Sequence, residues 1–214
     1  MKTDYERGIL LLFSGGLDST ALAAILRPKL ALFVDYGQRP AAAEGRAAKQ
    51  IAEVLGLPFQ AVELGIRAFG SGLLHDEEPT TIASSPSPEW WPYRNQFLAT
   101  AASAIALKEG CGTVALGTVR GDGLRHRDGT QDFYTKLDAL VRAQEGDIGV
   151  VAPALDHTTE EILLRANVGE SVLGWTISCH RSNLPCGECP GCWKRQRVLA
   201  TIGIEGYSWN TPKG

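Results

Sequence analysis

Short apolar runs alternate with longer amphipathic stretches along most of the chain. Residues 9–13, ILLLF, form a continuous apolar run before a serine and two glycines, which is typical of a buried parallel strand. Residues 94–110 instead carry apolar side chains at helical spacing. The expected strands span 9–13, 30–37, 58–64, 113–119 and 148–155. The expected helices span 19–26, 41–56, 94–110, 132–144 and 158–167.

This alternation predicts an α/β fold, an open parallel sheet with helices on both faces. The 214 residues, 44% of them hydrophobic, are enough for one such domain and a small appendage. We expect the α/β domain over residues 1–170 and a C-terminal lobe packed on it over 171–214. Residues 65–92 are rich in Gly, Ser and Pro and exceed an ordinary connection, which predicts a lid or a disordered flap.

Charge and cysteine content narrow the function classes. A net charge of −3 gives no general attraction to nucleic acid, so such binding would need a local basic patch such as residues 120–127. The start MKTDYERG lacks the apolar region of a signal peptide, and no apolar run approaches the roughly 18 residues of a membrane span. We therefore expect a cytoplasmic protein without membrane contact. In that compartment the five cysteines indicate metal binding or catalysis rather than disulfides.

The turn after the first expected strand has the sequence SGGLDS, residues 14–19. Glycine turns at the carboxyl ends of parallel strands let backbone N–H groups face an anion at the start of the next helix. The turn lacks the lysine of a Walker A loop and is not a G-x-G-x-x-G turn. One interpretation is an ordinary turn in which Asp18 or Ser19 caps the helix. The other follows from its S-G-G-x-D-S form, which resembles the pyrophosphate loop of ATP pyrophosphatases.

The resemblance to that loop implies ATP and Mg²⁺, with cleavage between the α- and β-phosphates. Such an enzyme stabilises departing pyrophosphate, for which backbone amides, hydroxyl groups and magnesium suffice. The residues expected to contact the pyrophosphate are Ser14, Gly15, Gly16, Leu17, Asp18 and Ser19. By their position at the end of the second strand, Phe33, Val34 and Asp35 are expected near the adenine.

Four cysteines crowd into fourteen residues near the C-terminus, in a C-x6-C-x2-C-x2-C pattern: Cys179, Cys186, Cys189 and Cys192. Four thiolates complete a tetrahedral Zn²⁺ shell, and each short C-x2-C turn carries a Gly or Pro. An iron–sulfur cluster is the alternative. A closed four-cysteine site is usually structural, so we assign the metal to folding. Cys111 lies outside the cluster and is expected to be a small buried residue.

The glycine turn and the cysteine cluster together resemble the 7-cyano-7-deazaguanine synthase (QueC) family, of the PP-loop ATP pyrophosphatase superfamily. Four more segments agree: VDYGQR at 34–39, WPYRN at 91–95, TISCH at 176–180 and PCGECPGC at 185–192. The resemblance implies ATP-dependent adenylation of a small-molecule carboxylate, 7-carboxy-7-deazaguanine. Ammonia then gives the amide, and a second ATP drives conversion to the nitrile. It also implies a homodimer, and catalytic roles for Ser14, Asp18 and Arg94, with Arg94 contacting phosphate or the carboxylate. Arg94 as a surface arginine at a helix start is the other interpretation.

Several positions depart from the family pattern. RHRDGTQDF at 125–133 lacks the expected cysteine and arginine, and DHTTEEIL at 156–163 lacks an expected lysine. The candidate replacements for the positive charge of that lysine are Arg125, Arg127 and Arg165. An alternative is a divergent relative that passes the activated carboxylate to an amine on a protein or nucleic acid, as in a defence system. A non-catalytic nucleotide- or partner-binding module and a tRNA sulfurtransferase or thiolase are further alternatives.

Overall fold

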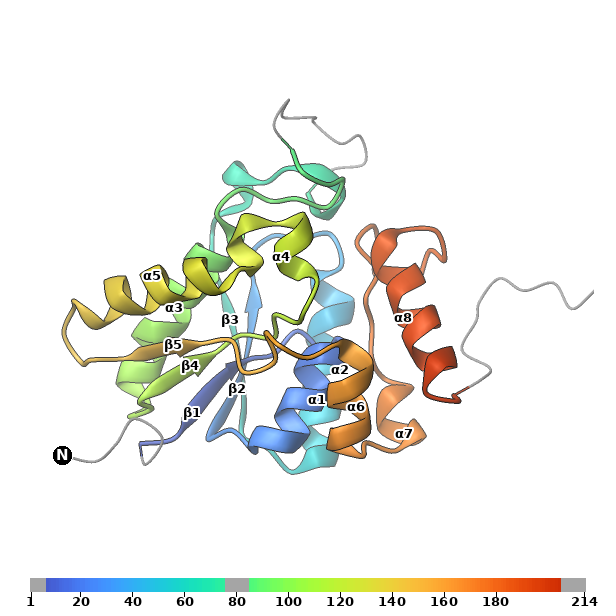
Figure 1. The fold of residues 1–214 in the computed structure, drawn as a ribbon, viewed down its shortest axis with the longest axis horizontal. Coiled ribbons are helices and arrows are strands. Elements are labelled where there is room, and N and C mark those ends of the chain that lie inside the picture. Colours follow the sequence, from blue (N-terminus) through green and yellow to red (C-terminus); the bar gives the residue numbers. More distant parts are fainter. Residues whose placement is uncertain (1–6, 76–84, 205–214) are drawn as a thin grey trace, which may run out of the picture.

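The computed structural model describes residues 7–75 and 85–204, and its centre is a five-stranded parallel sheet in the order β3-β2-β1-β4-β5 (Figure 1). The strands are β1 (Ile9–Leu12), β2 (Leu30–Asp35), β3 (Phe59–Glu63), β4 (Thr113–Ala115) and β5 (Gly149–Val151). The chain winds outward from β1 in one direction through β2 and β3, and then in the other through β4 and β5. The predicted α/β class is confirmed. A crevice is expected beyond the carboxyl end of β1, where the winding reverses.

Helices cover both faces of the sheet (Figure 1). One face packs against α1 (Leu17–Leu26) and α2 (Ala41–Leu55), and the same hydrophobic cluster extends to α6 (Thr159–Ala166), which packs on α1, and to α7 (Glu170–Leu173) and α8 (Pro190–Thr201). The other packs against α3 (Arg94–Lys108) and α5 (Gln131–Arg142). Side chains alternate between the two cores, since Leu11 belongs to the first and Leu10 and Leu32 to the second. Both faces of the strands are thus buried, which explains their unbroken apolar runs.

The observed elements differ from the predicted ones mainly at their ends. Helix α1 begins at Leu17, two residues earlier than expected. Strands β4 and β5 stop at Ala115 and Val151, although an isolated parallel bridge joins Val119 to Ala154 beyond them. The loop after β4 contains a short helix, α4 (Asp122–Arg125). The sequence pattern did not predict helices α7 and α8.

The long loop at 65–92 is packed where the structure describes it. Two 3-10 turns, Arg67–Phe69 and Gly72–Leu74, lie before its residues 76–84, which fall outside the described residues. Leu73 and Leu74 are buried, and the Trp91 side chain is 1% exposed. The expectation of a disordered flap is therefore wrong for the described parts of the loop, because their apolar side chains join the core. Closure over a ligand stays a prediction.

The C-terminal segment shares the core of the sheet. Val198 and Leu199 of α8 lie in the same hydrophobic cluster as Leu11 of β1 and Ile162 of α6. The predicted boundary between a domain ending at residue 170 and a lobe beginning at 171 stays a prediction. In the parts of the chain that the structure describes, no helix combines the length and apolar character needed to cross a membrane.

The turn between β1 and α1 requires glycine at residue 15. Gly15 has a φ of +74°, in the left-handed region that side chains disfavour. A Cβ added there would lie 2.7 Å from the backbone nitrogen of Ala48 in α2 and 3.0 Å from the Ala47 Cβ. The turn therefore packs directly on helix α2, with no space for a side chain.

Gly15→Ala should destabilise the protein more than Gly56→Ala does. Both positions have positive φ, but a Cβ at Gly56 would meet nothing within 4 Å. We expect Gly56→Ala to cost about 1 kcal/mol from backbone strain, and Gly15→Ala to cost about 2 kcal/mol more because the new Cβ overlaps α2. Urea unfolding of the two variants measures this difference, and equal costs would contradict the close packing of the turn.

Candidate functional site

A cavity of about 360 Å³ opens at the carboxyl edge of the sheet. It is lined by residues at and just after the ends of β1, β2 and β4, where the fold predicts a ligand crevice. Eight of the residues predicted from the sequence lie in its wall: Ser14, Gly16, Leu17, Asp18, Ser19, Phe33, Val34 and Arg94. The structure thus gathers the glycine turn, the end of the second strand and Arg94 around one space.

Gly15 and Asp35 are not among the lining residues. Gly15 shapes the turn from behind, against α2. The Asp35 carboxylate accepts a hydrogen bond of 2.9 Å from the Gly37 backbone N–H, so it fixes the bend after β2. Their predicted contacts with a nucleotide are untested, and their visible roles are structural.

The first turn of α1 faces the cavity without a side-chain cap. Gly16 is the N-cap residue, and neither Asp18 nor Ser19 caps the helix. The interpretation of Asp18 or Ser19 as the helix cap is therefore wrong. The Ser14 and Ser19 hydroxyl groups lie 3.3 Å apart, and the Ser19 hydroxyl donates to the Gly16 carbonyl at 3.2 Å. Uncapped N–H groups, two hydroxyls and the positive end of the helix dipole form an arrangement that suits a phosphate.

The Asp18 carboxylate joins the turn to two distant helices. Its Oδ1 accepts a hydrogen bond of 2.5 Å from the Thr159 hydroxyl at the start of α6. Its Oδ2 forms an ion pair of 2.8 Å with Lys194 Nζ, on α8. Lys194 also lines the cavity, and the sequence analysis missed it. The available signal in the sequence was the position of Lys194 two residues after Cys192. A cysteine cluster that folds against the turn brings the residues next to it close to the turn.

Arg94, the first residue of α3, lies in a polar group in the cavity wall with Tyr36, Glu44 and Asp128. Burial raises the pKa of Glu44 to about 7, although the Gln38 side chain donates to its Oε2 at 2.8 Å and Arg94 lies near. Burial also raises the pKa of Tyr36 to about 12. The site therefore contains a carboxyl group, that of Glu44, whose pKa lies near neutral pH. Glu44 was not predicted from the sequence, although it lies five residues after the VDYGQR segment.

A second charged group joins α4 and the residue after it to the segment before α3. Arg125 forms an ion pair of 2.5 Å with Glu89, whose side chain is 8% exposed, and His126 Nε2 lies 3.7 Å from the same carboxylate oxygen. Burial alone raises the pKa of the Glu89 carboxyl group. Hydrogen bonds from His126 and the backbone, together with the charge of Arg125, outweigh burial and lower that pKa to about 2. All three residues line the cavity, whereas Arg127 and Arg165 do not.

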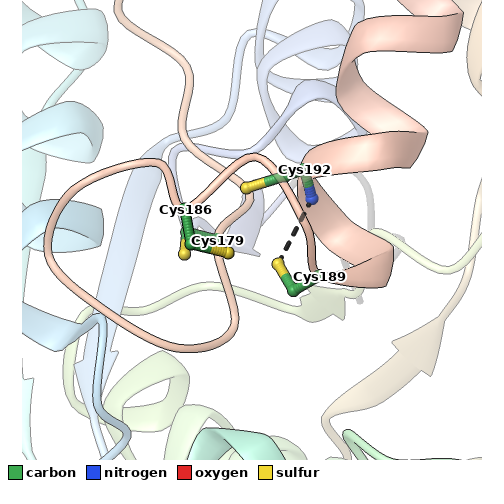
Figure 2. Close-up of side chains that lie close together, drawn as sticks. All are labelled: Cys179, Cys186, Cys189 and Cys192. Atoms are coloured by element: carbon green, nitrogen blue, oxygen red, sulfur yellow. Dashed lines mark hydrogen bonds between the residues drawn. The ribbon is translucent and has the colours of Figure 1, made fainter. Parts of the chain in front are cut away.

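The four cysteines converge as the spacing predicts (Figure 2). Their Sγ atoms all lie within 4.8 Å of one another, and three of the side chains are buried. Backbone N–H groups of His180 and Arg181 donate to Cys189 Sγ and Cys179 Sγ at 3.3 and 3.4 Å. Such hydrogen bonds stabilise thiolates, so the cluster can hold a metal ion. Cys111 is buried and apart from the cluster, as expected.

The cysteine-bearing segment contacts the glycine turn directly. The Ile177 N–H donates to the Gly15 carbonyl at 3.1 Å, just before the first cysteine. Gly191, between the last two cysteines, packs so tightly that a Cβ there would lie 1.8 Å from the Ser178 carbonyl oxygen. The cluster thus folds its segment into the wall of the cavity, which Ser178, His180, Gly191 and Lys194 also line.

Comparison with known proteins places the chain among queuosine biosynthesis proteins. A family model described as "Queuosine biosynthesis protein QueC" matches residues 8–203. The 7-cyano-7-deazaguanine synthase of Methanocaldococcus jannaschii is 29% identical over 222 residues, or 92% of this chain and 96% of that relative. The synthase of the same name from Campylobacter curvus is 29% identical over 208 residues, or 91% and 93%.

Two solved structures show weaker similarity. NMN synthetase from Francisella tularensis matches with a TM-score of 0.47 and 16% identity, over 78% of this chain and 64% of that one. A predicted subunit of tRNA methyltransferase from Methanocaldococcus jannaschii matches with a TM-score of 0.48 and 15% identity, over 92% and 89%.

Cys189→Ser should lose the metal and much of the stability, since metal binding and folding are coupled at such sites. The matched control is Cys111→Ala, which removes a buried thiol outside the cluster. We expect the control to keep one metal ion per chain and the Cys189 variant to melt far lower or fail to fold. Elemental analysis and thermal unfolding measure both properties. A stable, metal-free Cys189→Ser protein would contradict this assignment.

Glu44→Gln should change how stability depends on pH. Because folding raises the pKa of Glu44 from 4.5 to about 7, the native state holds the proton more tightly than the unfolded state. Its contribution to stability is complete below pH 4.5 and is lost as the pH rises through 7. The variant should therefore gain stability relative to the wild type between pH 5 and 8. Urea midpoints across that range measure the gain, and parallel pH profiles would show that Glu44 does not titrate as described.

Proposed function

The chain belongs to the QueC family, and we propose that it converts 7-carboxy-7-deazaguanine to 7-cyano-7-deazaguanine with ATP and ammonia. The observation that carries this proposal is the uncapped glycine turn, which opens into the same cavity as Arg94. One cavity can therefore hold the phosphates of a nucleotide beside a second, anionic substrate. The names of the curated relatives support this product.

The proposed reaction uses two rounds of adenylation. The substrate carboxylate attacks the α-phosphate of ATP, pyrophosphate leaves, and an acyl adenylate forms. Ammonia then displaces AMP, and loss of a proton gives the amide. In the second round the amide oxygen attacks the α-phosphate of another ATP, and pyrophosphate leaves. AMP then departs with that oxygen as the nitrile forms and two protons leave. No side-chain nucleophile is needed, so most of the rate comes from positioning and charge stabilisation.

The residues of the turn would act on the leaving pyrophosphate. N–H groups in the first turn of α1, with the Ser14 and Ser19 hydroxyls, are donors fixed before the reaction, so they stabilise charge without reorganising. The oxygen atoms of Asp18 are hard ligands of the kind that Mg²⁺ prefers. Arg94 would hold the substrate carboxylate, and Glu44 beside it can accept a proton from ammonia or the amide near neutral pH.

For the cysteine cluster we propose a structural Zn²⁺ ion. Four converging thiols fill a tetrahedral shell and leave no open position for a substrate. His180 lines the cavity but does not belong to the cluster. The ion would fix the segment that closes the cavity rather than take part in the reaction. The homodimer and the cytoplasmic location stay predictions.

A second candidate function is transfer of the activated carboxylate to an amine on a protein or nucleic acid. The observation that favours it is the Glu89–Arg125–His126 group, which occupies the cavity wall where the sequence departs from the family pattern. A changed wall indicates a changed substrate or acceptor, while the glycine turn for adenylation is kept.

Product analysis separates the two functions. Purified protein with Mg²⁺, ATP, 7-carboxy-7-deazaguanine and ammonium is expected to give the nitrile and AMP, detected by mass spectrometry. AMP with an adenylate or amide alone would favour the second function. No AMP under any condition would refute adenylation itself.

Ser14→Ala combined with Asp18→Ala should abolish AMP formation while metal content is unchanged. The double variant removes a hydroxyl donor and a carboxylate from the turn, but no cysteine ligand. The matched control is Asp132→Ala, an exposed carboxylate on α5 outside the cavity, which should retain full turnover. Undiminished AMP formation by the double variant would refute the placement of the nucleotide.

A further inference from the structure

We propose that Lys194, carried by the cysteine-bearing helix α8, is the cation that binds the pyrophosphate portion of ATP. This inference rests on the proposed use of ATP. It gives the C-terminal segment a binding role in addition to its structural one.

The position of Lys194 supports the assignment. Its Nζ lies 2.8 Å from Asp18 Oδ2, so the ammonium group is at the glycine turn, and its side chain is 36% exposed in the cavity wall. An ammonium group has three N–H donors. One of them is used by Asp18, which leaves donors for a phosphate oxygen beside the N-terminus of α1.

The other cations in the cavity have different partners. Among the described residues that line it, the lysine and arginine side chains are Arg94, Arg125 and Lys194. Arg94 lies with Tyr36 and Asp128, and Arg125 is paired with Glu89. Lys194 is the one with an ion pair to the turn. It therefore places a positive charge beside the aspartate that Thr159, at the start of α6, also contacts.

The neighbours of Lys194 fix its direction. Helix α8 begins at the N-cap Cys189, whose Sγ accepts the Cys192 N–H at 3.5 Å. On the other side, the buried Arg195 donates to the Thr176 hydroxyl at 3.0 Å and to the Leu173 carbonyl at 3.1 Å. Cys192 and Arg195 are thus held in the protein interior, while Lys194, on another side of the helix, reaches the cavity and pairs with Asp18.

Two substitutions separate the charge of Lys194 from its bulk. Lys194→Gln keeps most of the stem without the charge, and Lys194→Arg keeps the charge. The matched control is Lys136→Gln on α5, where the lysine is 74% exposed and pairs with Asp132 away from the cavity. Calorimetry of each holoprotein with Mg-ATP, inorganic pyrophosphate and AMP reports binding independently of turnover, and elemental analysis reports the metal.

We expect Lys194→Gln to weaken Mg-ATP and pyrophosphate binding about 10- to 100-fold, the size of one charge-assisted hydrogen bond. AMP binding and metal content should be unchanged, and Lys194→Arg should retain most of the affinity. Unchanged affinity for pyrophosphate, or an equal loss for AMP, would overturn the assignment. If the wild type binds neither ATP nor pyrophosphate, the proposed function fails as well. If the wild type binds both and the variants behave as expected, but no nitrile forms, the role of Lys194 stands and the proposed product fails.

Discussion

The contact between the glycine turn and the C-terminal segment is the interaction on which the site depends. The Gly15 carbonyl accepts a hydrogen bond from Ile177, and Asp18 forms an ion pair with Lys194. These contacts join residues that are more than 160 positions apart in the sequence. The cysteine cluster lies between Ile177 and Lys194, so it holds both contacts in place. The cysteine cluster thereby helps to complete the wall of the cavity.

The sheet provides the second constraint. Because β1 lies at the centre and the chain winds outward on both sides of it, the segments after β1, β2 and β4 diverge around one crevice. Two groups of polar side chains line this crevice. The turn, Asp18 and Lys194 form one group, which suits phosphates, and Arg94 with Glu44 forms the other.

The sequence predicted local features well and long-range ones poorly. The apolar runs predicted all five strands, and the cysteine spacing predicted a cluster that the structure brings together. Helix α8 was missed because its N-cap is a thiol, Cys189, which is not a usual cap residue, and because its burial follows from the folded cluster. Lys194 and Glu89 were missed for a related reason. Their partners, Asp18 and Arg125, come from distant segments, and no local pattern records such a pairing.

The most direct test of the account is a crystal structure with Mg²⁺ and an ATP analogue whose α,β-bridge is a methylene group, which prevents the proposed cleavage. The account predicts the β- and γ-phosphates on the N–H groups at the start of α1, with the adenine toward the end of β2 and Lys194 on a phosphate oxygen. A triphosphate bound elsewhere, or one that leaves the glycine turn without contacts, would contradict the central claim that this turn is the phosphate site.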